Sequence, residues 1–191
     1  MALITADVGG GNWNVGATWV GGVAPGAGDD ALLAATSGNV TITASTTVNS
    51  LNCTGYTGTL THNASVIFTI DGQDASGNSL IMVAGMTYTL GSATTSDITF
   101  TGAGTSKITT GGKTLGNIIF NNSDDTFQLQ DGLTTSGNIT NTAGTFDPNL
   151  QTVTMTGATP TITPTAALSF YNLTRTGNAV KTDTLILAGN I

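Results

Sequence analysis

The side chains able to do acid–base chemistry in this chain are almost all aspartates. The sequence holds 11 acidic residues, every one an aspartate, and four lysines and arginines. Asp71 and Asp74, in the stretch IDGQDASG, are the nearest pair of the kind that glycosidases use, in which two carboxylates several ångströms apart share the acid and base roles. They lie in a turn-rich polar stretch, which favours a structural role.

Metal binding and nucleophilic catalysis have little support. His62 is the only histidine, which excludes a multi-histidine metal centre, and no G-x-S-x-G nucleophile turn occurs. Asp29-Asp30 and Asp124-Asp125 offer carboxylates, but the spaced D-x-D-x-D calcium loop is absent, so we interpret both pairs as turn aspartates that cap local N–H groups. We therefore predict that the protein is not an enzyme, with no catalytic residue, no cofactor and no metal.

Binding through aromatic side chains is the other chemistry to consider. The stretch GNWNVGATWVGGVAPGAGDD, residues 11–30, contains both tryptophans, Trp13 and Trp19, which are spaced to lie on one side of an extended segment. They could form an exposed platform for a glycan, or an apolar plug over the first coil of a repetitive fold, and we favour the plug. Tryptophan is also enriched at interfaces, so Trp13, Trp19 and Pro25 are our candidate anchoring residues.

The charge balance excludes several classes of partner. The formal net charge is −7, and the few cations are scattered, so no basic patch is available to neutralise phosphates and we predict no nucleic-acid partner. No stretch approaches the roughly 18 apolar residues of a membrane span, so we predict no membrane partner. MALITADVGG lacks the basic and apolar regions of a secretory signal. The single cysteine, Cys53, excludes an intrachain disulfide and shares strand parity with Leu51, which predicts an inward-facing side chain.

The elements that would position these residues are predicted to be short strands. The chain has 39 threonines, which favour strands, and 26 glycines, which favour turns. Apolar residues alternate with Thr, Ser and Asn in runs that have the length of strands. The runs are NVTIT (39–43), SVIFTIDG (65–72), SLIMVAG (79–85), MTYTLG (86–91), DITFTG (97–102), SKITTGG (106–112), NIIFNN (117–122), FQLQDG (127–132), TVTMTG (152–157), LSFYNLT (168–174) and TLILAGNI (184–191).

An internal echo favours a repetitive arrangement of these strands. Residues 115–139 resemble residues 168–191, with an offset of 52 residues between Asn138 and Asn190. We predict an all-β fold, a parallel and right-handed β-solenoid (β-helix), in which residues 1–38 form a short irregular N-terminal cap and residues 39–191 form the repeats, cut off inside a repeat. A β-sandwich, which also has many short strands at regular spacing, is the alternative.

The opening segment and three later stretches carry a resemblance to a known group of proteins. Together with TVNSLNCTGYTGTLTHNAS (47–65), ITFTGAGTSKITTGGKTLGNIIFNNS (98–123) and LTTSGNITNTAGTFDPN (133–149), it resembles β-solenoid repeat proteins of phage virions, of the head-decoration, head-fibre or tail-fibre type, and is similar also to repeats of bacterial surface adhesins. The resemblance rests on repeat texture and includes no catalytic motif.

The resemblance implies a non-enzymatic structural protein of a phage particle, displayed on the virion surface as a capsid decoration or fibre protein and assembled in the host cytoplasm. Its partners would be other virion proteins of the capsid shell or tail, and it would form a homotrimer anchored through the N-terminal region. The alternative is a glycan-binding adhesin or receptor-binding tail fibre that contacts a host-surface glycan.

Overall fold

Parallel strands build the described part of the chain. The computed structural model describes residues 1–176 and 186–187. In this part, every register between named strands is parallel. The one antiparallel contact is the isolated bridge between Ala6 and Trp19. The all-β, parallel prediction is confirmed, and the described strands lack the antiparallel pairing that a β-sandwich requires.

The largest sheet has twelve strands and bends into two arms that share the long strands β14 (Asn117–Leu129) and β16 (Ile139–Asp147). The first arm adds β5 (Thr46–Val48), β8 (Val66–Ile70), β11 (Ser96–Phe100), β18 (Thr161–Pro164) and β20 (Ile186–Leu187). The second arm adds β1 (Leu3–Thr5), β3 (Asp30–Leu32), β6 (Ser50–Asn52), β9 (Asn78–Ile81) and β12 (Gly104–Thr109).

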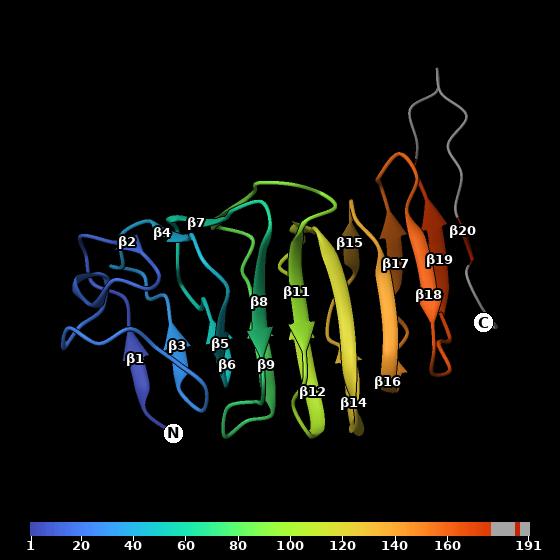
Figure 1. The fold of residues 1–191 in the computed structure, drawn as a ribbon, viewed down its shortest axis with the longest axis horizontal. Helices are drawn as coiled ribbons and strands as arrows, with labels where there is room; N and C mark the ends of the chain where they lie inside the picture. Colours follow the sequence, from blue (N-terminus) through green and yellow to red (C-terminus); the bar gives the residue numbers. More distant parts are fainter. Residues whose placement is uncertain (177–185, 188–191) are drawn as a thin grey trace.

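Two four-stranded sheets form a third wall. Along the chain, most strands of this wall follow a strand of the second arm and precede a strand of the first arm. The first contains β2 (Gly11–Asn12), β4 (Val40–Ile42), β7 (Thr59–His62) and β10 (Thr87–Leu90). The second contains β13 (Thr114–Leu115), β15 (Leu133–Thr135), β17 (Thr152–Met155) and β19 (Asn172–Arg175). Figure 1 shows the strands stacked side by side along the long axis, from β1 at one end to β18, β19 and β20 at the other.

The stacking step in the second half of the third wall is twenty residues. Thr114, Thr134, Thr154 and Thr174 are paired in succession, each twenty positions after the previous one. This step is shorter than the echo of 52 residues. Much of the second copy of that echo, residues 177–185 and 188–191, lies outside the described residues.

The core lies inside the strands because alternate side chains point inward. β11 and β17 show the strict in–out alternation that the sequence predicted, and Cys53 is buried with Leu51 as expected. Phenylalanines from successive strands form a column in this core, with ring centroids 5.8 Å apart for Phe100–Phe120 and 5.2 Å apart for Phe120–Phe146. NIIFNN and FQLQDG, predicted as two strands, belong to the single strand β14.

The N-terminal segment joins this stack. Residues 1–38 contribute β1, β2 and β3 to the sheets, together with the short 3-10 helix η1 (Gly16–Thr18). These strands have two or three residues each, as expected of a short-stranded segment, and the division at residue 38 stays a prediction.

Candidate functional site

The two tryptophans of the opening segment pack against each other inside the protein. η1 turns the chain between them, so they do not share one side of an extended strand as the spacing suggested. The indole rings meet edge to face with centroids 4.8 Å apart, and Trp13 meets Phe68 in the same way at 5.1 Å. Trp19 Nε1 donates a hydrogen bond of 2.7 Å to the backbone carbonyl of Trp13. The exposed fractions are 0% for Trp13 and 2% for Trp19.

This burial overturns the hypothesis of a glycan platform at Trp13 and Trp19, because a sugar can stack only on an indole face that solvent reaches. Pro25 is buried as well. The arrangement agrees with the other hypothesis, an apolar plug at the end of the stack. Since the chain itself covers all three side chains, an anchoring role of the N-terminal region must rest on other residues, and sequence reasoning did not identify them.

A group of large apolar side chains is exposed at the N-terminal end. Their exposed fractions run from 47% to 86%, and outside this group only Ile67, Leu150 and Tyr171 are exposed large hydrophobics in the described chain. We call the group the N-terminal apolar surface. It consists of Met1, Leu3, Val8, Val15, Val20 and Val23.

Backbone hydrogen bonds hold this surface in place. Val20 N–H donates to the Thr5 carbonyl at 2.9 Å, and Asp7 N–H donates to the Thr18 carbonyl at 2.8 Å, so the segment after η1 lies beside the end of β1. Gly21 and Gly22 follow with φ of 89° and 75°, a left-handed backbone that glycine adopts without strain. Valines within a glycine-rich segment are the sequence signal that would have indicated this surface.

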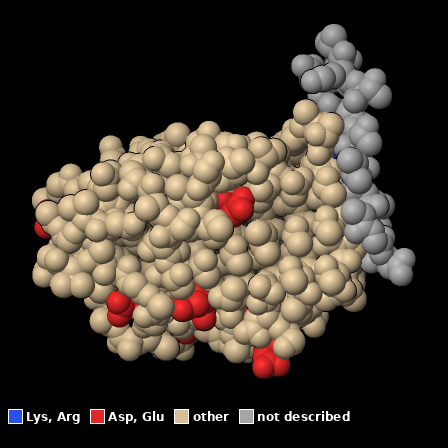
Figure 2. Space-filling view, viewed as in Figure 1, with Lys and Arg blue, Asp and Glu red and all other residues tan. Residues whose placement is uncertain are grey.

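The charged side chains around this end are all carboxylates. Asp29 accepts hydrogen bonds from the N–H groups of Ala2 and Gly26, which confirms its predicted role as a turn cap. Asp30 instead lies in β3 and accepts from the Asn49 amide and the Ser50 hydroxyl at 2.6 Å. No lysine or arginine precedes Lys107 in the sequence. On the face drawn in Figure 2, a few isolated carboxylates interrupt an otherwise uncharged surface.

His62 is a structural core residue at the end of β7. Its Nε2 lies 3.0 Å from the Val66 carbonyl oxygen, which can only accept, so Nε2 carries the proton and Nδ1 accepts from the Tyr88 hydroxyl at 2.9 Å. Burial lowers the pKa of His62, against smaller opposing effects of the Val66 hydrogen bond and the Asp97 charge. The imidazole is therefore held neutral.

Lowering the pH from 7 to 5 is expected to destabilise the fold through His62. The unfolded imidazole takes up a proton near its ordinary pKa of 6.5, whereas the folded one resists it, so the stability that is present above pH 6.5 declines as the pH falls below it. Urea midpoints across this range test the prediction. His62→Gln should flatten the dependence, and an unchanged slope in that variant would contradict it. Asp125→Asn provides the control, because burial raises the pKa of Asp125 and acts in the opposite sense.

Asp74, Asp125 and Cys53 have structural roles as well. Asp74 accepts hydrogen bonds from the backbone N–H groups of Ser76 and Asn78, as a turn residue does. The prediction for Asp125 is wrong, because this residue is only 3% exposed and accepts a 2.5 Å hydrogen bond from the Ser106 hydroxyl of the neighbouring strand. Burial raises the pKa of the Cys53 thiol to about 12, which leaves it unreactive near neutral pH.

Among residues 1–176 and 186–187, no three His, Cys, Asp or Glu side chains come together to hold a metal ion. The same part of the chain has no helix with the length and hydropathy to cross a bilayer.

Comparison with known proteins returns no relative. A scan against protein-family models, a search of curated proteins and a search of solved structures each give no match.

Proposed function

We propose that this protein is a parallel β-solenoid that acts as a non-enzymatic structural component of a phage particle, displayed on the exterior as a capsid decoration or fibre protein. The observation that carries the proposal is the contrast between a mostly uncharged stack of parallel strands and the N-terminal apolar surface.

The stack supports a structural role through its continuity. Parallel pairing runs from β1 to β20, and the step of twenty residues aligns threonines on successive strands of the third wall. Repeated coils that bury one continuous core give a cooperative, rigid rod. Neutral Thr and Asn side chains on adjacent strands avoid the repulsion that stacked like charges would cause.

The N-terminal apolar surface supports attachment at one end. Exposed apolar patches mark protein-interaction sites on soluble proteins, and six of the exposed large apolar residues of the described chain belong to its first 23 residues. Attachment through this end would leave the rest of the rod projecting. In this proposal the N-terminal apolar surface contacts the capsid shell or tail.

Three copies of the chain associate in this proposal. Light scattering of the isolated protein should therefore give three times the chain mass of 19.1 kDa.

Charging the N-terminal apolar surface is expected to release the protein from its particle. The double variant Val20→Asp, Val23→Asp should stay folded, because exposed substitutions change stability by only about 0.5 kcal/mol, yet should lose most of its occupancy on purified particles. Leu150→Asp, at an exposed apolar residue between β16 and β17, is the matched control and should bind as the unaltered protein does. Quantitative gel analysis and electron microscopy of particles measure occupancy.

Two results would contradict the proposal. Purified particles that contain no copy of the protein would remove the virion role itself. Wild-type occupancy of the Val20→Asp, Val23→Asp variant would leave that role standing but exclude attachment through this end.

A further inference from the structure

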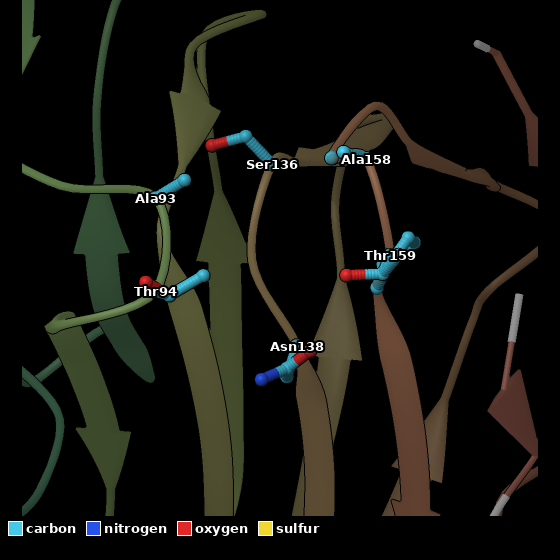
Figure 3. A pocket seen from close by; sticks show the side chains of 8 residues that line it. Ala93, Thr94, Ser136, Asn138, Ala158 and Thr159 are labelled. Atoms are coloured by element: carbon cyan, nitrogen blue, oxygen red, sulfur yellow. The ribbon is translucent and has the colours of Figure 1, made fainter. Parts of the chain in front are cut away.

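A notch lies in the corner between the third wall and the first arm, far from the N-terminal apolar surface. Its volume is about 230 Å³. It is lined by Ala93, Thr94, Ser136, Asn138, Gly157, Ala158, Thr159 and Pro160. These residues come from three turns on different coils, and Figure 3 shows the turn with Ala93 and Thr94 facing the turn with Ala158 and Thr159 across the gap.

Unequal corner lengths create this notch. Four connections pass through this corner. The first, residues 91–95 between β10 and β11, and the last, residues 156–160 between β17 and β18, are long. The two connections between them are short and consist of Gly116 alone and of residues 136–138. Two protruding turns therefore flank two tight ones, over three strand spacings or roughly 14 Å. Gly137, between the lining residues Ser136 and Asn138, packs so closely on the first of these turns that a Cβ atom would overlap the Ala93 carbonyl oxygen.

The floor presents one side-chain donor without a partner. Asn138 accepts from Thr161 N–H through Oδ1 at 2.8 Å, and its backbone N–H donates to Asn117 Oδ1 at 2.8 Å, which fixes the side chain. Among the described residues its Nδ2 has no hydrogen-bond partner. Asn117, one coil earlier, uses its own Nδ2 on the Thr94 carbonyl and Asp97. In Figure 3 the Asn138 amide nitrogen points toward the turn that carries Thr94.

The lining has the chemistry of a site for a small neutral ligand with hydroxyl groups. The methyl groups of Ala93, Ala158 and Thr94 offer apolar surface, while the Asn138 amide and the Thr159 hydroxyl offer hydrogen bonds, and no charged side chain lines the notch. The volume is below the roughly 300–1,000 Å³ of sites for drug-sized ligands, which limits the occupant to a single small unit.

We propose that this notch binds one sugar residue of a neutral glycan. The apolar C–H face of the ring would lie on the alanine methyl groups, and Asn138 Nδ2 would donate to a ring hydroxyl. The inference does not depend on where the protein is displayed, and it places glycan contact on the side of the rod instead of at Trp13 and Trp19. A ligand of this size binds with a dissociation constant on the order of 1 mM.

Saturation-transfer difference NMR on the full chain tests the proposal, with methyl glycosides of neutral hexoses and of N-acetylhexosamines as probes. Signal is expected from at least one neutral glycoside and not from sialic acid, which the net charge of −7 repels. Ala158→Trp fills the notch and should abolish the signal, whereas Ala103→Trp, at an exposed turn between β11 and β12, should leave it unchanged.

Asn138→Asp tests the donor itself. The substitution keeps the oxygen that accepts from Thr161 N–H and removes the free amide donor, so binding should weaken at least fivefold while the urea midpoint stays the same. Signal that persists in both Ala158→Trp and Asn138→Asp would overturn the site, and the absence of signal from every neutral glycoside at millimolar concentration would overturn the ligand class. Neither result would bear on attachment to a particle.

Discussion

Trp13→Ala is expected to lower the free energy of unfolding by about 3–5 kcal/mol and to loosen the first strands, because it removes a fully buried indole from the N-terminal end of the core. Trp13 contacts both Trp19 and Phe68, so the cavity left by the substitution would lie between Trp19 and Phe68 of β8. Urea unfolding followed by circular dichroism measures the loss. Proteolysis of the native protein should show new cleavage within the N-terminal segment.

Two phenylalanine substitutions serve as the controls for this prediction. Trp13→Phe should be the milder change, because Trp13 Nε1 is buried without a hydrogen-bond partner and phenylalanine leaves no donor unsatisfied. Trp19→Phe loses the 2.7 Å bond to the Trp13 carbonyl and should cost about 1 kcal/mol more. Equal stability of Trp13→Ala and the unaltered protein would show that the plug does not stabilise the stack.

Phe120→Ala is expected to destabilise the protein by a similar amount, about 3–5 kcal/mol, from the middle of the stack. The Phe120 ring lies 4.8 Å from that of Phe127 and 5.2 Å from that of Phe146, so it packs the first arm of the large sheet against the second. Its loss should broaden the urea transition, since the strands on either side would unfold less cooperatively.

Ile119→Ala is the matched control for this substitution. Ile119 is the neighbouring residue on β14 and points away from the core, so the expected loss is below about 1 kcal/mol. A Phe120→Ala variant as stable as Ile119→Ala would contradict the role assigned to the aromatic column.

Local features of the sequence were enough to predict the class of fold. Threonine and alternating apolar residues specify strands, and their two-residue period decides which side chains face inward, as Leu51 and Cys53 show. The turn role of Asp29, which accepts from the Gly26 N–H, followed equally from local chemistry. These properties depend only on neighbours along the chain, which a sequence displays directly.

The candidate sites depended on which strand pairs with which, and only the tertiary structure decided that. The local sequence indicates a turn at Asp125. The register between β12 and β14 instead places Asp125 beside Ser106, where it is buried. The burial of Trp13 and the exposure of Val20 follow from how the first segment folds over the end of the stack. Ala93, Asn138 and Ala158 meet because corner loops on separate coils differ in length, and the spacing of residues along a single strand carries no information about such a difference.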